Sequence, residues 1–271
     1  MKLRGKIALV TGAARNVGKG IALRFACEGA HVVMNDVNAG ALDALVDAWK
    51  KDGLSVSAAL ADVSDAEAMR RVVEAVVREF GTLDVLVNNA VIHPELGERG
   101  PFLKVTSEGW REFMRRNLDA LFFTTQHAAR VMAKNRSGSV INLSSNGAVQ
   151  AHRQTIAYDS LKGAVESFTR AVAVDLAPWN VRVNALRPIA VEEPTPPGEK
   201  PGVRDRSLGA MVPMGRIAHP ADVAAAAVFL AADDAQFITG QVITIDGGML
   251  EQSRPPQLEI QPVILPEDLE L

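Results

Sequence analysis

The sequence predicts an α/β protein built on one doubly wound, seven-stranded parallel sheet with helices on both faces. Short apolar runs rich in Val and Ile alternate with longer segments in which apolar residues recur at helical spacing. The short runs are apolar at nearly every position, which is typical of parallel strands buried on both faces. These runs are KIALVTG, AHVVMND, LSVSAALAD, LDVLVNNA, GSVINLSS, VRVNALRP and QVITIDGG.

The segments between the strands carry the helical repeat. Gly29 and Gly81 stand at positions where such helices commonly end. The alternation continues over residues 1–250 and predicts a single domain. The clearest helical segments are VGKGIALRFACEGA, AEAMRRVVEAVVREFG and LKGAVESFTRAVAVDLA.

Composition narrows the classes of function. The chain has 271 residues, of which 48% are hydrophobic and 23% are charged, and its formal net charge is -3. This is ordinary globular composition. Acidic and basic residues are spread along the chain without a long like-charge block, so binding to nucleic acid or to an anionic membrane is not predicted. We expect a small-molecule substrate.

The cellular setting is predicted from the lone cysteine and the short apolar runs. Cys27 alone cannot build a disulfide framework or a thiolate zinc site, which fits a reducing compartment, and no metal site is predicted. The N-terminal apolar run is too short for a signal peptide, and the run over 223–232 is too short to span a bilayer. We expect a cytoplasmic protein.

Two stretches interrupt the alternation. Residues 192–210 are rich in Pro, Gly and charge and follow a predicted strand, so we interpret them as a lid over the substrate, with a solvated insertion as the alternative. Residues 251–271 form a proline-rich extension whose prolines exclude a regular helix. We expect this extension either to cross to a neighbouring subunit or to be disordered.

The first predicted strand runs into TGAARNVGKG, a loop suited to phosphate. Gly12 and Gly18 let the backbone turn and approach a pyrophosphate at the N-terminus of the following helix. Asn16 occupies the place of a usual middle glycine, and asparagine enters the left-handed region more readily than most residues. The loop therefore predicts a dinucleotide site.

The second strand ends at Asp36, where a carboxylate can accept hydrogen bonds from the adenosine ribose hydroxyls. A 2'-phosphate would be repelled there, which favours NAD over NADP, although Arg15 could compensate in part. The alternative for Asp36 is a turn or helix-capping role, and for Arg15 a solvated side chain.

Tyr158, the only tyrosine, stands four residues before Lys162, so the two side chains share one face of a helix. A nearby ammonium favours the phenolate and lowers the pKa of a tyrosine, which would let Tyr158 pass a proton to or from an alcohol. Ser145 follows a predicted strand, where its hydroxyl could hold the substrate oxygen.

From Lys6 to about Met249 the chain resembles the short-chain dehydrogenase/reductase family, a Rossmann-type fold. The resemblance is carried by Thr11-Gly12, Asp36, Asp62-Val63, NNAV at 88–91, Asn117, Ser145, Tyr158, Lys162 and the C-terminal VPMGRIAHPADV segment, in the family order. It implies hydride transfer between a nicotinamide and a carbonyl or alcohol carbon, by an enzyme that commonly forms tetramers.

By that resemblance Tyr158 is the general acid/base and Lys162 lowers its pKa while binding the nicotinamide ribose. Ser145 binds the reacting oxygen, and Asn117 holds a water in the proton relay. The implied cofactor-binding residues are Gly12, Arg15, Asn16, Val17, Gly18, Asp36, Asp62, Val63, Asn89, Ala90, Tyr158, Lys162, Pro188 and Val191.

The chain departs from the family at four positions. Asn16 and Val91 replace glycines, Ile189 replaces the glycine of a proline-glycine pair, and Glu193 stands where a threonine is frequent. These changes predict a reshaped nicotinamide pocket. A non-catalytic cofactor-binding protein is therefore an alternative, which the complete catalytic set disfavours.

The leading prediction is an NAD-dependent oxidoreductase of a secondary alcohol or ketone, with an NADPH-dependent 3-oxoacyl-thioester reductase as the enzymatic alternative. A sugar, polyol or anionic hydroxy compound is the expected substrate, since guanidinium groups suit carboxylates. Ser145, Arg153 and Tyr158 are the predicted substrate contacts. Further candidate bases are His93, His152, Arg187, Lys200, Arg204 and Arg206, for which a solvated polar rim is the alternative.

Overall fold

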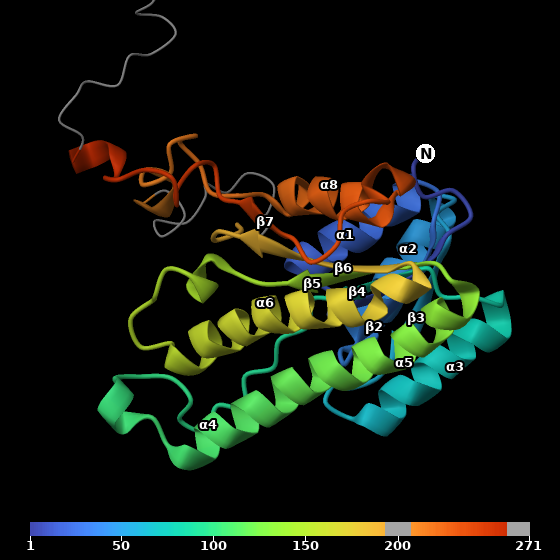
Figure 1. The fold of residues 1–271 in the computed structure, drawn as a ribbon, viewed down its shortest axis with the longest axis horizontal. Helices are drawn as coiled ribbons and strands as arrows, with labels where there is room; N and C mark the ends of the chain where they lie inside the picture. Colours follow the sequence, from blue (N-terminus) through green and yellow to red (C-terminus); the bar gives the residue numbers. More distant parts are fainter. Residues whose placement is uncertain (193–206, 259–271) are drawn as a thin grey trace, which may run out of the picture.

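The computed structural model describes residues 1–192 and 207–258. Within them, seven parallel strands form one sheet in the order β3-β2-β1-β4-β5-β6-β7, which confirms the predicted fold class (Figure 1). Every predicted strand is present. The strands are β1 (Ile7–Thr11), β2 (His31–Asp36), β3 (Val56–Leu60), β4 (Val85–Asn88), β5 (Gly138–Leu143), β6 (Val181–Pro188) and β7 (Val242–Ile245).

Helices cover both faces of the sheet (Figure 1). One layer contains α1 (Asn16–Cys27), α2 (Ala39–Lys51) and α8 (Pro220–Ala231). The other contains α3 (Ala66–Phe80), α5 (Ala120–Asn135) and α6 (Ile156–Leu176), with the short α4 (Ser107–Met114) ahead of α5. The three clearest helical segments of the sequence are α1, α3 and α6.

The predicted glycine positions lie at helix ends. Gly81 caps α3 in the left-handed region with φ 79°, and the Asp65 carboxylate accepts hydrogen bonds from two backbone amides at the other end of this helix. Gly29, with φ 90°, follows the end of α1 and leads into β2. These local signals separate the helices from the strands that they connect.

The chain reverses its direction of winding between β1 and β4. β1 pairs with β2 on one side and with β4 on the other, so the loops after β1 and β4 diverge at the carboxyl edge of the sheet. Such a switch point leaves a crevice in which α/β proteins bind ligands. The sheet topology thus places the loop containing Gly12 beside the chain that follows β4.

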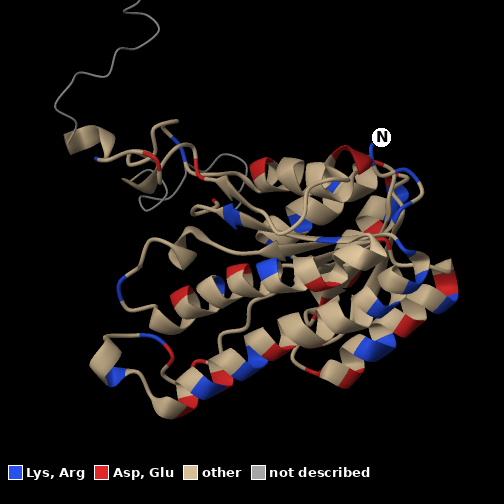
Figure 2. Ribbon diagram, viewed as in Figure 1, with Lys and Arg blue, Asp and Glu red and all other residues tan. Residues whose placement is uncertain are grey.

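The core lies in two layers. Phe25, Met34 and Trp49 belong to the layer beneath α1, α2 and α8, and Met69 and Leu86 to the layer on the opposite face. The helices between these layers and solvent carry interspersed charges of both signs (Figure 2). Within the described ranges, no helix is both long and apolar enough to cross a bilayer.

Two helical glycines provide a test of packing between α1 and α8. A Cβ on Gly20 of α1 would lie 2.7 Å from Cβ of Pro220 in α8, whereas a Cβ on Gly163 of α6 would have no atom within 4 Å. Alanine favours a helix over glycine by about 1 kcal/mol, and overpacking costs roughly 1–3 kcal/mol. Gly163→Ala should therefore raise the unfolding free energy, and Gly20→Ala should lower it.

Denaturant unfolding of the two variants beside the unmodified chain measures this difference, expected at about 2 kcal/mol. Equal stabilisation by both substitutions would show that α1 and α8 are not in the close contact described.

Candidate active site

A cleft of about 370 Å³ opens at the switch point of the sheet. It is bounded by the β1–α1 loop, by the ends of β2 and β3, and by the chain after β4. All the cofactor-binding residues predicted in the first half of the chain line it. They are Gly12, Arg15, Asn16, Val17, Gly18, Asp36, Asp62, Val63, Asn89 and Ala90.

The β1–α1 loop is built for close backbone approach. Gly12 has φ +63°, and a Cβ on Gly18 would lie 2.0 Å from the Gly12 carbonyl oxygen, so a side chain at Gly18 is excluded. The Asn89 side-chain amide donates to the carbonyl oxygens of Thr11 and Gly12, at 2.9 and 3.1 Å. Asn89 therefore lies beneath the loop and fixes it to the end of β4.

Asn16 adopts the left-handed conformation expected of it, with φ +44°. Its side-chain oxygen is buried without a hydrogen-bond partner in the described residues, although the side chain lines the cleft. Buried polar atoms are normally paired, so this amide suits a polar group of a bound molecule. The loop fits the pyrophosphate of a dinucleotide despite lacking the middle glycine.

Asp36 has both roles that the sequence left open, a turn residue and a residue of the cofactor cleft. Its carboxylate accepts hydrogen bonds from the backbone amides of Ala14 (3.0 Å) and Asn38 (3.1 Å), and it also lines the cleft. It is thus a turn residue placed where a ribose would bind. Asp62 is held in a similar way, because one of its oxygens accepts from the amide and hydroxyl of Ser64.

The replaced family residues have different surroundings. Val91 lines the cleft and packs near Tyr158, whereas Ile189 is buried against Val212 and Ala218 and has no positive φ. The backbone there accommodates a side chain without left-handed strain, so the replacement of the family glycine by Ile189 requires no strained conformation. Glu193 lies outside the described residues, as does most of the predicted lid.

Two further residues predicted to bind the cofactor lie at or just beyond the carboxyl end of β6. Pro188 is the last residue of this strand and is buried. Val191 forms an isolated bridge with Ala218 beyond it.

Three of the four predicted catalytic residues lie after β5 and on α6. Ser145 is the second residue after the end of β5 at Leu143, and α6 carries both Tyr158 and Lys162. The Lys162 ammonium donates to the Leu143 carbonyl oxygen at 2.6 Å and lies 5.4 Å from the centroid of the Tyr158 ring. Because Lys162 is buried, its pKa is lowered to about 8.

The pKa of Tyr158 is raised from its ordinary value, opposite to the direction expected from Lys162. Burial of the phenol is the main cause, and the hydrogen bond with Ser145 and the charge of Arg99 lower the pKa by less. Lys162 does not reverse this shift, because its ammonium points to the Leu143 carbonyl rather than to the phenol. The phenol is therefore protonated near pH 7 in this structure.

Asn117 lies in a π-helical turn, Arg115–Asp119, between α4 and α5. Its amide oxygen accepts from the backbone N–H of Ile92 (2.7 Å), and its amide nitrogen donates to the carbonyls of Ile92 (2.7 Å) and Phe113 (2.8 Å). Asn117 therefore fixes the chain after β4 to the helix below it. It also lines a cavity of about 30 Å³ that reaches Lys162.

The segment between β4 and α4 contains Glu98 and Arg99, which the sequence analysis did not select, close to the candidate base His93. His93 packs between Phe113 and Tyr158, with ring centroids 5.4 and 6.3 Å apart. Arg99 lies against His93, and the carboxylate of Glu98 is buried beside it. Neither Glu98 nor Arg99 belongs to a recognisable motif, so only the folded loop reveals them.

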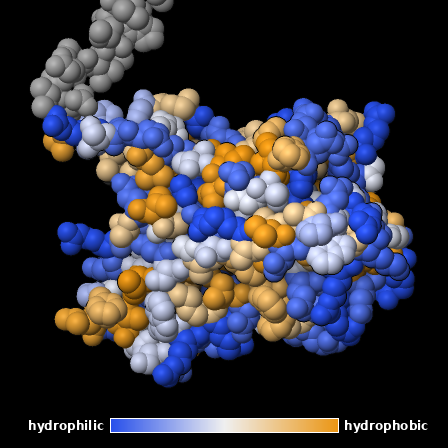
Figure 3. Space-filling model, in the orientation of Figure 1, coloured by the Kyte–Doolittle hydropathy of each residue, from blue (hydrophilic) through white to orange (hydrophobic). Residues whose placement is uncertain are grey.

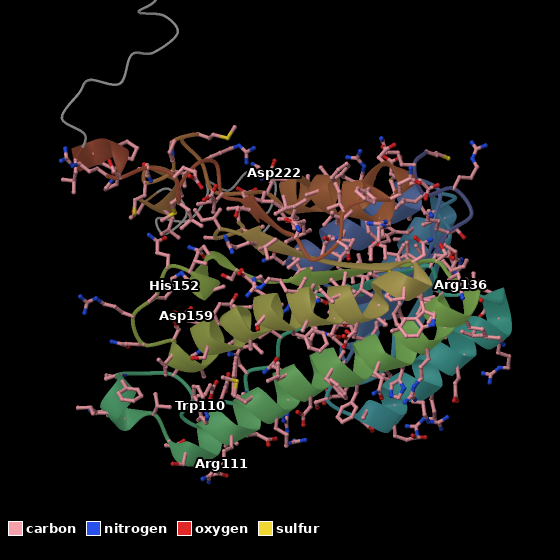
Figure 4. All side chains as sticks on the ribbon, in the orientation of Figure 1. Trp110, Arg111, Arg136, His152, Asp159 and Asp222 are labelled. Carbon is pink, nitrogen blue, oxygen red and sulfur yellow. The ribbon has the colours of Figure 1, made fainter. Side chains whose placement is uncertain are left out.

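Two other predicted bases, Arg187 and His152, are already paired. Arg187 forms a two-pronged ion pair with the buried Glu166, at 2.7 and 2.8 Å, and is therefore not a free substrate contact. His152 hydrogen-bonds to Asp159 through its ring and its backbone N–H, and Figure 4 shows the two side chains beside one another near the start of α6. Arg153 is exposed in the same loop.

The remaining candidate bases, Lys200, Arg204 and Arg206, lie outside the described residues. The first part of the C-terminal extension turns back toward the chain before α8, because Gln252 and Gln257 donate to the carbonyls of Met211 and Ala210. Its apolar residues after Leu258 lie beyond the described range.

Buried Lys162 predicts a pH-dependent cost to stability. Its pKa falls from 10.5 in the unfolded chain to about 8 in the folded protein, so between these values the unfolded chain binds more protons. Stability should rise with pH through this window. Lys162→Met should be more stable at pH 7 by roughly 1–3 kcal/mol, after allowing for the lost bond to Leu143, and the gap should shrink toward pH 10.

Denaturant unfolding at pH 7 and at higher pH checks this, with Lys51→Met on the exposed surface of α2 as control. A variant that is less stable at pH 7, or a gap independent of pH, would contradict the assigned burial.

Comparison with known proteins agrees with this geometry. A family model described as enoyl-(acyl carrier protein) reductase matches residues 12–250. A 3-oxoacyl-(acyl-carrier-protein) reductase of Thermotoga maritima is 37% identical over 252 residues, covering 92% of this chain and 100% of that protein.

Two solved structures are similar over most of their length. A gluconate 5-dehydrogenase from Burkholderia cenocepacia J2315, in complex with NADP and tartrate, has a TM-score of 0.83 and 30% identity, and the match covers 93% of this chain and 97% of that one. An NAD⁺-bound xylitol dehydrogenase has a TM-score of 0.83 and 31% identity, with coverages of 92% and 100%. The chain therefore belongs to the short-chain dehydrogenase/reductase family and is an oxidoreductase that acts on CH–OH groups with a nicotinamide cofactor.

Proposed function

We propose that the protein interconverts a secondary alcohol and a ketone with NAD, using Tyr158 as the general acid/base. The observation that carries this proposal is the placement of Ser145, Tyr158 and Lys162 around the end of β5, next to the glycine-lined cleft. The nicotinamide, when bound, supplies or accepts the hydride. The side chains of this chain bind the reacting oxygen and move its proton.

Each catalytic side chain has a distinct task. The Ser145 hydroxyl holds the reacting oxygen and also lowers the pKa of the Tyr158 phenol. Tyr158 takes the alcohol proton during oxidation and returns it during reduction. Because burial alone keeps the phenol protonated, a cation close to the hydroxyl is needed for it to act as a base near neutral pH. The buried ammonium of Lys162 supplies this charge, provided that its Nζ turns away from Leu143.

A proton path through Lys162 is supported by the cavity of about 30 Å³ that Lys162 shares with Asn117 and Thr124. This volume accommodates a single water molecule. The buried hydroxyl of Thr124 has no partner in the described residues and lines the cavity, so it can hydrogen-bond to that water. Asn117 shapes the cavity by fixing the chain at Ile92.

We propose NAD rather than NADP as the preferred cofactor because Asp36 presents a carboxylate to the ribose end of the cleft. The carboxylate is anchored by two backbone amides and cannot easily turn away from a 2'-phosphate. Arg15 lines the same end of the cleft and is the residue that would favour NADP. The related structures include one with NADP and one with NAD⁺.

The proposed substrate is a sugar, a polyol or an anionic hydroxy compound. Relatives named gluconate 5-dehydrogenase and xylitol dehydrogenase support this class. The relative named 3-oxoacyl-(acyl-carrier-protein) reductase keeps an NADPH-dependent thioester reductase as the second candidate, and Asp36 disfavours it. We propose a homotetramer, which the family resemblance implies, in the cytoplasm, as the lone cysteine and the short apolar runs of the sequence predict.

Replacing Tyr158 tests the proposed chemistry. Tyr158→Phe keeps the buried ring and removes the hydroxyl, so turnover should fall by about 10²–10⁴-fold while the affinity for NAD(H) is kept. Nicotinamide absorbance with a panel of secondary alcohols, sugars and hydroxy acids gives the rate, and calorimetry gives the cofactor affinity. Cofactor binding without turnover in the unmodified protein, for every substrate tried, would favour a non-catalytic protein.

Replacing Asp36 tests the cofactor preference. Asp36→Asn removes the negative charge but keeps an oxygen for the loop amides, so the ratio of kcat/KM for NADP to that for NAD should rise by about 10-fold or more. Asp62→Asn changes a carboxylate on the same cleft that the family resemblance places against the adenine, so it should affect both cofactors alike. A native preference for NADP would contradict the assignment of Asp36 and favour Arg15.

A further inference from the structure

The segment between β4 and α4 folds back beside the proposed acid/base. His93 stacks on the Tyr158 ring, with centroids 6.3 Å apart and planes inclined by 24°, and its other side contacts Phe113. Its imidazole is about half-buried. A residue placed in this way lines the space in which the substrate of Tyr158 must sit.

Arg99 is held next to this ring. Its Nη2 lies 3.0 and 3.2 Å from the two ring nitrogens of His93. Burial, and then the charge of Arg99, lower the pKa of His93, so the ring is neutral near pH 7 and one nitrogen can accept from the guanidinium. The next residue, Gly100, donates to the Gln154 carbonyl at 2.9 Å, which ties this segment to the loop before α6.

The positive charge of Arg99 has no carboxylate partner within ion-pair distance in the described part of the chain. Glu98 is 2% exposed and accepts from the amide of Leu96 at 3.0 Å, so its carboxylate holds the turn. Asp159 is paired with His152. Within the described residues the exposed guanidinium of Arg99 thus lies beside His93, a residue of the cleft, without an acidic partner.

We propose that Arg99, positioned by His93, binds the carboxylate of a hydroxy-acid substrate whose neighbouring alcohol reacts at Tyr158. This inference rests on the proposed function and names its substrate class. A guanidinium fork matches a carboxylate with two parallel hydrogen bonds, whereas a neutral polyol gains little from its charge. During oxidation the carbinol carbon gives a hydride to NAD⁺ and its hydroxyl proton passes to Tyr158, leaving an oxo acid, NADH and one proton.

The test compares matched substrates that differ in one carboxylate, gluconate against glucitol and threonate against threitol. The unmodified enzyme should favour each acid. Arg99→Gln should lower kcat/KM for the acids by about 10–100-fold, mainly through KM, and change the polyols by less than about threefold. Arg99→Lys should keep part of the preference.

Arg111→Gln is the matched control, because Arg111 is exposed on α4, points away from the sheet (Figure 4) and does not line the cleft. It should leave both classes unchanged. An equal loss for acids and polyols in Arg99→Gln would indicate a structural role and overturn the inference. So would a native preference for the polyols, which would leave the proposed oxidoreductase function intact.

A binding measurement separates the two proposals if no alcohol is turned over. Calorimetry with tartrate and the NADH-saturated protein should show binding that Arg99→Gln weakens by at least 10-fold. That result without turnover would support the role of Arg99 and count against the proposed reaction. No tartrate binding, together with no turnover, would overturn both.

Discussion

The register between β5 and α6 is the constraint on which the proposed site depends. Buried polar contacts connect the strand and the helix in three successive places: Asn142 donates to Thr169 (2.9 Å), Lys162 to the Leu143 carbonyl (2.6 Å), and Ser144 to Glu166 (2.8 Å). A one-turn slip of the helix would leave all of these groups unpaired, at a cost of roughly 1–3 kcal/mol each. The position of Ser145 relative to Tyr158 is therefore set by polar contacts that do not touch the substrate.

Glu166 extends this constraint to the next strand. Burial opposes its ionisation, yet hydrogen bonds from Arg187 and Ser144 outweigh burial and lower its pKa. Because removing one partner of a buried ion pair leaves the other charge unpaired, the pair couples α6 firmly to β6. Arg187 directly precedes Pro188, so the contact also locates the backbone that is expected to meet the nicotinamide. The ion pair between Glu166 and Arg187 thus fixes the geometry of the site, while the proposed catalysis uses the neighbouring Lys162.

The sequence predicted the strands and the shared face of Tyr158 and Lys162, because both depend on local periodicity. It failed where the outcome depends on distant contacts. Arg187 was predicted as a free base, but it pairs with Glu166 on α6, far away in the sequence. The pKa of Tyr158 is raised by burial, which the spacing of residues along the chain does not reveal. The sequence could not identify Arg99, because its contact with His93, which stacks on Tyr158, is made by a loop with no regular pattern.

The division between predicted and unpredicted residues follows a physical difference between the two parts of the site. The cofactor cleft and the acid/base lie on strand ends and a long helix, whose positions the sheet fixes. The proposed substrate side lies on the segments after β4 and β5, which are joined by the hydrogen bond from Gly100 to Gln154. Apolar side chains gather on the surface of the segment between β4 and α4, at the lower left of Figure 3. Changes in these loops can alter which alcohol enters without disturbing the proposed proton transfer. If Arg99 binds the substrate as proposed, substrate choice depends on such loop contacts rather than on the shared motifs.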